Sequence, residues 1–342
     1  MTIDNLNTSL SYKDLESNGY LLIPSFLSPA EIEMFENDIA VRNIAYAQKK
    51  LKNDNYRWIE NPSKEVFEKF IDKFTSVYST VAQQTNIKAD LLLGGTYFST
   101  QGGQSFGWHQ DHESYYFYQN HYHYLNLYIP IIKPEISKSN LCIIPFDRLK
   151  ARNPDIYQKV LGKGAVYYKV ENNITIIYNE NDGGEYGRLD YSIDDIAETP
   201  QLKSGDLLLL RGDVIHRTED ATTLRTALSV RIASTQKKIS KIELVDGGLK
   251  KFQMMLNGRA LYQILLSYFD EMKVNELSLT DWEKFHEFSK TFSEEQIMSR
   301  SQFSKYLLLQ KIRMGLFYNT AIVLSHFLGA HFNKFVMKLG IK

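Results

Sequence analysis

A pair of turns frames a short strand at residues 203–216, which read KSGDLLLLRGDVIH. Each turn is a Gly-Asp dipeptide, and tight turns favour both residue types. Four leucines lie between the turns, and the β-branched residues Val214 and Ile215 follow the second turn. We therefore predict a buried strand, a reversal of the chain, and a second short strand that carries His216 toward the interior of a β-barrel.

Short β-rich runs separated by turn residues continue on both sides of this segment, from Asp90 to about Ala233. They lie at 91–99, 122–132, 141–144, 174–178, 207–210 and 225–232. Such spacing is typical of an all-β sandwich or barrel. The sequence thus predicts a mainly β core inside a chain of mixed α and β structure.

Helical patterns flank this core. The run at 19–24 reads as a strand, and Pro29 then begins a helix expected to reach about Ala40. Apolar residues recur at helical spacing over 64–85, and again after about residue 240. Thr280 and Ser293 are predicted to cap two of the later helices. We expect N-terminal helices that buttress the core and a C-terminal helical extension.

Composition excludes several classes of protein. The 342 residues are 43% apolar and contain 40 basic and 40 acidic residues, with no long run of one sign, so we expect no nucleic-acid partner. Cys142 is the only cysteine, which excludes an internal disulfide and a thiolate metal cluster. The first 13 residues lack the apolar core of a secretory signal. A cytoplasmic protein is expected.

The tripeptide His109-Gln110-Asp111 is a candidate for metal binding. On an extended segment, residues two apart project to the same side, so the imidazole and the carboxylate face one point. Taken alone, the tripeptide favours a surface turn or a simple His–Asp hydrogen bond over metal binding. Together with His216 it supplies two histidines and one carboxylate, the facial triad of non-haem Fe(II) oxygenases, which leaves coordination positions open.

A run with arginine at both ends follows at Arg225-Thr-Ala-Leu-Ser-Val-Arg231. On a strand, Arg225, Ser229 and Arg231 share one face. A buried guanidinium needs an anion, and the distal carboxylate of 2-oxoglutarate matches its two-pronged geometry. An ordinary structural salt bridge is the alternative for either arginine. The position of Arg225 nine residues after His216 favours it as the anchor, and Arg231 stays open as the alternative.

Weaker candidates surround these motifs. Tyr97, Gln104 and Asn126 lie on or beside strands expected to line the barrel mouth, where they would donate hydrogen bonds to 2-oxoglutarate. Residues 112–123, HESYYFYQNHYH, form either a wall of the substrate pocket or aromatic packing over the rim. The largely apolar stretch at 303–339 contains interspersed lysines, so packing on the core, a subunit interface and contact with a membrane surface are all open.

Four segments resemble the phytanoyl-CoA dioxygenase family of Fe(II)- and 2-oxoglutarate-dependent oxygenases. They are GYLLIPSFLS at 19–28, WHQD at 108–111, NLCIIP at 140–145, and the stretch from Gly205 through His216 to Ser229. The resemblance implies a double-stranded β-helix (jelly-roll, cupin-like) core. It also implies Fe(II), 2-oxoglutarate and dioxygen as cofactor and cosubstrates, with oxidation of a small organic substrate and release of succinate and CO2. We expect an oxygenase domain over 1–240 and a packed helical extension over 241–342.

The chain departs from the family pattern at two places. The family arginine usually lies slightly further from the distal histidine than Arg225 does, and Pro145-Phe-Asp-Arg148 replaces a Pro-Gly-Ser-His ending. Asp111 is retained where related halogenases carry a small residue, which disfavours halogenation. We expect hydroxylation, with desaturation or cyclisation by the same cofactor as alternatives. A non-catalytic or zinc-binding cupin-like protein is the alternative from other classes.

Overall fold

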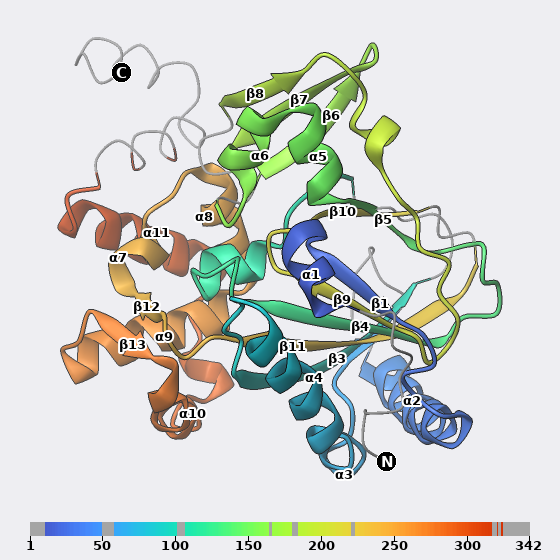
Figure 1. The fold of residues 1–342 in the computed structure, drawn as a ribbon. Helices are drawn as coiled ribbons and strands as arrows, with labels where there is room; N and C mark the ends of the chain where they lie inside the picture. Colours follow the sequence, from blue (N-terminus) through green and yellow to red (C-terminus); the bar gives the residue numbers. More distant parts are fainter. Residues whose placement is uncertain are drawn as a thin grey trace.

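The protein combines antiparallel sheets with helices on several sides (Figure 1). The computed structural model describes residues 11–49, 58–100, 107–163, 166–179, 184–219 and 223–316, together with Thr320 and Val323. No helix within these ranges is long and apolar enough to cross a bilayer. Most of the apolar stretch at 303–339 lies outside the described residues, so its predicted contacts stay open.

The larger sheet has six strands in the order β1-β9-β4-β11-β3-β2, and all neighbours are antiparallel. The strands are β1 (Tyr20–Ile23), β2 (Trp58–Glu60), β3 (Leu91–Thr100), β4 (Leu125–Ile132), β9 (Leu207–Arg211) and β11 (Arg225–Ala233). The four-leucine run forms β9, as predicted, and pairs with β1 and β4.

The second sheet contains β5 (Leu141–Ile144) paired with β10 (Ile215–Thr218), and β6 (Val166–Glu171), β7 (Ile174–Asn179) and β8 (Glu185–Leu189) paired in that order. His109 connects the two halves, because it forms antiparallel bridges with His216 on β10 and with Tyr167 on β6. Strands β6 and β8 were not anticipated from the sequence.

Alternation along the strands divides their side chains between two layers. Leu207 and Leu209 join the core beneath the N-terminal helices, whereas Leu208 and Leu210 join a cluster with Leu141 and Ile143 of the second sheet. The two sheets therefore face one another across the second cluster. This arrangement places the inward faces of β4, β10 and β11 around a common interior.

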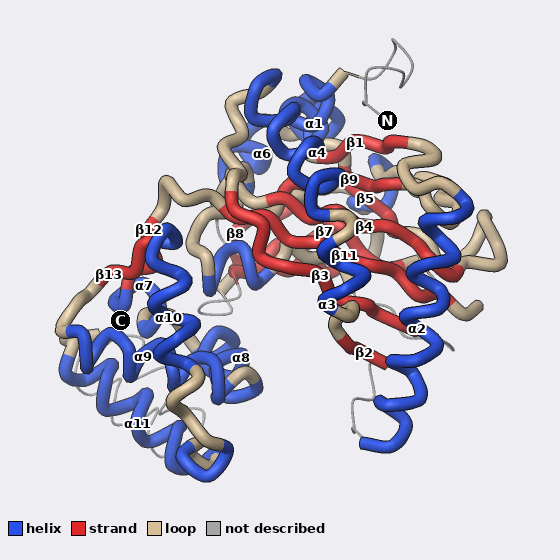
Figure 2. The backbone as a smooth tube through the Cα atoms, turned by 90° about the horizontal axis from the view of Figure 1, so that it is seen from below, coloured by secondary structure: helices blue, strands red, loops and turns tan. Residues whose placement is uncertain are grey.

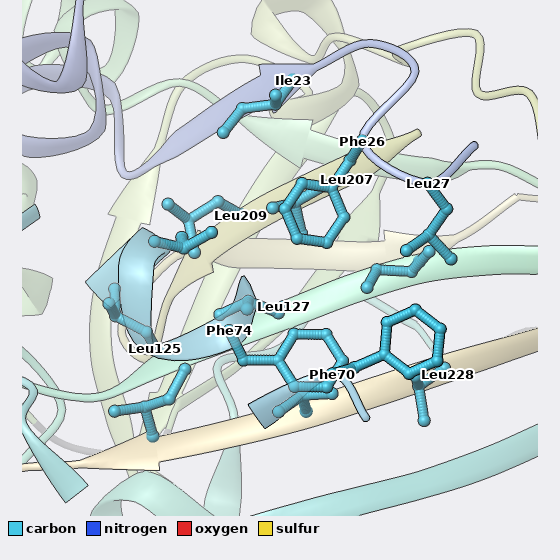
Figure 3. Close-up of a cluster of buried hydrophobic side chains, with 14 of the residues drawn as sticks. Ile23, Phe26, Leu27, Phe70, Phe74, Leu125, Leu127, Leu207, Leu209 and Leu228 are labelled. Atoms are coloured by element: carbon cyan, nitrogen blue, oxygen red, sulfur yellow. The ribbon is translucent and has the colours of Figure 1, made fainter. Parts of the chain in front are cut away.

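Helices α2 (Pro29–Lys49), α3 (Lys64–Glu68) and α4 (Ile71–Gln84) cover the outer face of the six-stranded sheet (Figure 2). Phe70 and Phe74 pack there against strand residues such as Leu127 and Leu228 (Figure 3). The expected single helix over 64–85 is divided, because a turn at 69–70 interrupts it. These helices and the strands of the sheet share one hydrophobic cluster. The described residues before the C-terminal region also form the helices α1 (Tyr12–Asn18), α5 (Phe146–Arg152) and α6 (Pro154–Val160).

The C-terminal region is helical, as expected, and includes a short β12–β13 pair. Its elements are β12 (Lys238–Ser240), α7 (Lys241–Val245), α8 (Leu249–Asn257), α9 (Arg259–Met272), β13 (Glu276–Ser278), α10 (Trp282–Ser289) and α11 (Arg300–Arg313). One hydrophobic cluster joins them to Phe117, Tyr118 and Tyr124 beside the core. The expected helix start at Ser293 is corrected: only a 3-10 turn forms there, and the capping box of α11 begins at Ser299.

Candidate metal centre and cosubstrate cavity

His109 and His216 are brought together by backbone pairing. The His109 N–H donates to the His216 carbonyl and the His216 N–H donates to the His109 carbonyl, each at 3.0 Å. Residues that exchange both hydrogen bonds in an antiparallel pair project their side chains from the same face. The imidazole centroids accordingly lie 4.5 Å apart.

The orientation of each imidazole is set by its own chain. Nδ1 of His109 lies 2.7 Å from the Gly107 carbonyl, and Nδ1 of His216 lies 3.1 Å from the Val214 carbonyl. A carbonyl only accepts hydrogen bonds, so each neutral ring must carry its proton on Nδ1. The lone pair is therefore on Nε2 of both rings, and metal-ligating histidines use the same tautomer, with the other ring nitrogen donating to a carbonyl or carboxylate.

Asp111 completes a set of three donors. One ligand atom from each of His109, Asp111 and His216 lies within 4.8 Å of the others. The Asp111 carboxylate is 3.7 Å from Nε2 of His216 and 4.0 Å from the Arg231 guanidinium. Two nitrogen donors and one carboxylate at this separation match the facial triad in ligand type and number. The three residues fit a divalent metal.

The electrostatics of this cluster favour an ionised Asp111 carboxylate and a neutral His109 imidazole, the forms that bind a metal. Burial would raise the pKa of Asp111, but the charges of His216 and Arg231 outweigh that effect, and the pKa lies below its ordinary value. Loss of hydration, assisted by repulsion from His216, lowers the pKa of His109 to about 4. A metal binds carboxylate and neutral imidazole, so little proton competition is expected near neutral pH.

A cavity of about 150 Å³ opens beside the three donors. Its wall includes His109, Asp111 and His216, and it continues toward β5, β10 and β11 with the lining residues Phe98, Asn126, Tyr128, Leu141, Thr218, Arg225, Ser229 and Arg231. The predicted inward face of β11 is thus present. Apolar and polar side chains share this lining, as in most small-molecule sites.

Arg225 and Arg231 differ in their partners. Arg225 is 4% exposed, donates to the Ser139 carbonyl at 3.0 Å, and has no carboxylate within 4.0 Å among the described residues. Arg231 faces Asp111 and lies 3.5 Å from the Glu113 carboxylate. A buried guanidinium without an anion is costly. Among the described residues, Arg225 therefore has no carboxylate that balances its charge.

Asn126 and Ser229 form a buried polar pair on neighbouring strands of the cavity wall. The Ser229 hydroxyl donates to Oδ1 of Asn126 at 2.7 Å. This bond directs the Asn126 carbonyl oxygen toward Ser229 and leaves the amide nitrogen as the donor end of the side chain. Both residues lie at the predicted cavity.

The structure corrects the expectation for Tyr97. Its side chain lies on the outer face of β3, fully buried, and its hydroxyl donates to Asp38 on α2 at 2.9 Å. Neighbouring strand residues point to opposite faces, so Phe98 lines the cavity in its place. Gln104 falls outside the described residues. The aromatic segment from 112 contains a π-helix, η2 (Glu113–Phe117), and Phe117 packs into the C-terminal cluster.

Three residues behind the histidines, Trp108, Arg217 and Asp194, contact one another, and we call them the brace. The sequence did not indicate these contacts. Trp108 and Arg217, the neighbours of the two histidines, lie opposite one another on the reverse face, with the guanidinium 5.0 Å from the indole ring. Asp194 binds both, at 3.2 Å from the indole nitrogen and 3.2 Å from Arg217. Asp194 comes from the 3-10 turn η3 (Ile193–Ile196), and no local pattern indicates this long-range contact.

Antiparallel sheets enclosing two histidines, one carboxylate and an adjacent buried arginine define a candidate non-haem metal enzyme of the 2-oxoglutarate-dependent type. The model of the phytanoyl-CoA dioxygenase (PhyH) family matches residues 15–227. The chain belongs to this family, and it is an iron- and 2-oxoglutarate-dependent oxygenase.

Comparison with curated protein sequences gave no significant match. Among solved structures, the chain is similar to the carbocyclase SnoK from nogalamycin biosynthesis, with 12% identity, a TM-score of 0.45, and coverage of 69% of this chain and 87% of that one. HygX from Streptomyces hygroscopicus, with nickel and 2-oxoglutarate bound, has 16% identity and a TM-score of 0.41, with coverage of 69% of this chain and 88% of that one. A Pseudomonas putida prolyl-4-hydroxylase has 11% identity and a TM-score of 0.41, with coverage of 65% of this chain and 96% of that one. With TM-scores below 0.5, these likenesses carry no argument about reaction or substrate.

Proposed function

We propose that His109, Asp111 and His216 hold the Fe(II) of this oxygenase. The observation that carries the proposal is the pair of imidazoles whose Nδ1 atoms are both bonded to carbonyl groups. This bonding turns the two Nε2 atoms into the donors that face the Asp111 carboxylate. Arg231, beside that carboxylate, helps to keep it ionised and restrains its orientation.

Arg225 is proposed to bind the distal carboxylate of 2-oxoglutarate. It lies in the same cavity as the three metal donors, and it has no acidic partner among the described residues. Asn126 and Ser229 line the same cavity, and the Asn126 amide nitrogen offers a neutral donor, because the Ser229 hydroxyl donates its proton to Asn126 Oδ1. Arg231 is assigned to Asp111 and Glu113, because their carboxylates lie 4.0 Å and 3.5 Å from its guanidinium.

The proposed reaction is hydroxylation of a C–H bond in a small organic substrate. When bound, the iron couples the conversion of 2-oxoglutarate and dioxygen into succinate and CO2 to oxidation of that bond. The protein positions the metal through three side chains, binds the cosubstrate through Arg225, and surrounds both with apolar residues such as Phe98 and Leu141 that restrict water. Retention of Asp111 as the third ligand supports hydroxylation over halogenation.

We further propose that the two facing sheets form a double-stranded β-helix, with the oxygenase domain at 1–240 and the helical extension at 241–342. One hydrophobic cluster contains residues of β4 and β9 from the larger sheet and of β5 from the second sheet, which supports a closed core. The family match ends at residue 227, before the extension begins.

The deciding experiment is anaerobic loading of the purified protein with Fe(II) and 2-oxoglutarate. Chelation of 2-oxoglutarate to iron produces a weak visible charge-transfer band, which we expect in the wild type. His216→Ala should abolish the band. His286→Ala, which removes an exposed histidine on α10, is the matched control and should leave it unchanged. Absence of the band in the wild type, or its persistence in His216→Ala, would refute the iron assignment.

A further inference from the structure

The row of side chains that begins with the two histidines continues across β6 and β7. His109 pairs with Tyr167, flanked by hydrogen bonds from Tyr168 N to Trp108 O at 3.1 Å and from Gln110 N to Val166 O at 3.4 Å. Flanking bonds of this kind mark a non-hydrogen-bonded pair, in which the opposed side chains lie on one face and approach most closely. Tyr167 is therefore the immediate neighbour of the His109 imidazole.

Tyr167 in turn pairs with Tyr178 on β7. The two rings are stacked, with centroids 4.9 Å apart and planes inclined by 12°. We call Tyr167 and Tyr178 the tyrosine wall. Both rings are only partly buried, and neither belongs to any of the hydrophobic clusters formed by the described residues. The opposite face of the same strands packs into the core beside α6 through Tyr168 and Ile177.

The wall lies on the side of the metal donors that the cosubstrate does not use. The cavity with Arg225 extends from the histidines toward Leu141 on β5 and Thr218 on β10. In the second sheet, β10 is on one side of His109 and β6 is on the other. If 2-oxoglutarate fills the β5–β10 side, a substrate reaches the metal from the β6–β7 side, across the tyrosine wall.

One cation stands over this wall. Nζ of Lys250, from α8 of the C-terminal extension, is 6.0 Å from the centroid of the Tyr167 ring. Lys250 is exposed, and no carboxylate lies within 4.0 Å of it among the described residues. The other charges on β6 and β8 are paired locally, Lys169 with Glu171 and Arg188 with Glu185. Within the described part of the chain, Lys250 thus offers positive charge at the wall that no carboxylate neutralises.

We infer that the tyrosine wall and Lys250 form the substrate-binding subsite, and that the substrate carries a flat, apolar ring together with an anionic group. The substrate ring packs against the edges of the Tyr167 and Tyr178 rings, whose faces are turned to each other, and the anion lies near the Lys250 ammonium. This inference rests on the proposed function, because it takes the metal at His109 as the reacting centre. It also assigns a role to the C-terminal extension, which supplies the charged part of the subsite.

Three probes separate the two parts of the subsite: indole-3-acetate has a ring and a charge, indole has the ring alone, and acetate has the charge alone. Binding to the metal-free protein is measured by saturation-transfer NMR. We expect indole-3-acetate to bind best, with at least about five-fold weaker binding in Tyr178→Ala and about three-fold weaker binding in Lys250→Gln. Indole should respond to Tyr178→Ala only, and Tyr178→Phe should retain the binding of both. Acetate alone should show no measurable binding.

Lys159→Gln is the matched control, because Lys159 lies 5.9 Å from the ring of Tyr186 away from the metal donors. It should leave all three probes unaffected. Probe binding that is indifferent to Tyr178→Ala, or that falls equally in Lys159→Gln, overturns the inference. The Fe(II)–2-oxoglutarate band is recorded for the same variants. A normal band with unchanged probe binding rejects the subsite alone, whereas a missing wild-type band rejects the proposed function.

Discussion

The carboxylate of Asp194 bridges Trp108 and Arg217, which lie directly behind the two histidines of the proposed metal site. His109 and His216 depend on the pairing of two segments that are far apart in the chain. The indole–guanidinium contact at 5.0 Å holds those segments together on the reverse face. The brace therefore acts on the site through backbone position, without touching the metal donors.

Removal of the brace is expected to weaken metal binding. Asp194→Ala deletes the acceptor for both Trp108 and Arg217, so we expect metal affinity to fall by a few fold, less than the roughly 10-fold or greater loss seen when a partner of a ligand itself is removed. Titration of the metal-free protein with Fe(II) or Zn(II) by calorimetry measures this. Asp195→Ala, an exposed neighbour on η3, should bind metal as the wild type does. Equal affinities in the two variants would show that the brace has no positioning role.

Replacement of Arg225 is expected to affect 2-oxoglutarate and not iron. Charge-assisted hydrogen bonds contribute about 1.5–3 kcal/mol, so Arg225→Met should raise the 2-oxoglutarate concentration for half-formation of the visible band by about 10- to 100-fold. Arg231→Met should act mainly through Asp111, and so weaken iron binding instead. The opposite assignment of effects would make Arg231 the cosubstrate anchor.

The ion pair of Arg211 and Asp213 is expected to stabilise the fold strongly. Both side chains are fully buried and lie 2.6 Å apart, and Arg211 also donates to the Glu16 carbonyl. Asp213→Asn leaves a buried guanidinium without its counter-charge, which typically costs about 3–5 kcal/mol. The free energy of unfolding in urea measures this loss. Lys238→Met breaks the exposed pair with Glu276 and should change that energy by less than about 1 kcal/mol.

Two buried lysines in the C-terminal extension should make stability depend on pH. Burial lowers the pKa of Lys251 to about 7 and that of Lys311 to about 8, against about 10.4 in an unfolded chain. Above pH 7 the unfolded state therefore binds more protons than the folded state, and stability rises with pH. We expect a gain on the order of 2–3 kcal/mol between pH 6.5 and pH 8.5, measured by urea unfolding.

Lys251→Met should flatten this pH dependence, because it removes the group that must lose its proton on burial. Lys305→Met is the control, since Lys305 is exposed on the same helix as Lys311, and its pH profile should follow the wild type. A wild-type stability that falls or stays constant over this pH range would contradict the assignment of the lysines.

Local sequence was sufficient to predict strands and side-chain directions where these follow from turn residues or from the two-residue period of a strand. The Gly-Asp turns around the four leucines predict β9 and the return strand to His216. The period of two in β11 predicts that Arg225, Ser229 and Arg231 share a face, and the cavity lining agrees. The same period relates His109 to Asp111. In each case the side-chain direction follows from strand geometry alone.

Tertiary pairing determined the rest. Strand β3 reads LLLGGTYFST, which is apolar at both parities, so only the packing of α2 against it shows that Tyr97 faces the core and Phe98 the cavity. Likewise, nothing near His109 in the chain predicts that Tyr167 pairs with it, that Asp194 braces it from behind, or that Lys250 reaches the same wall. These contacts join distant segments, and their register depends on the pairing of whole strands, which a local pattern does not encode.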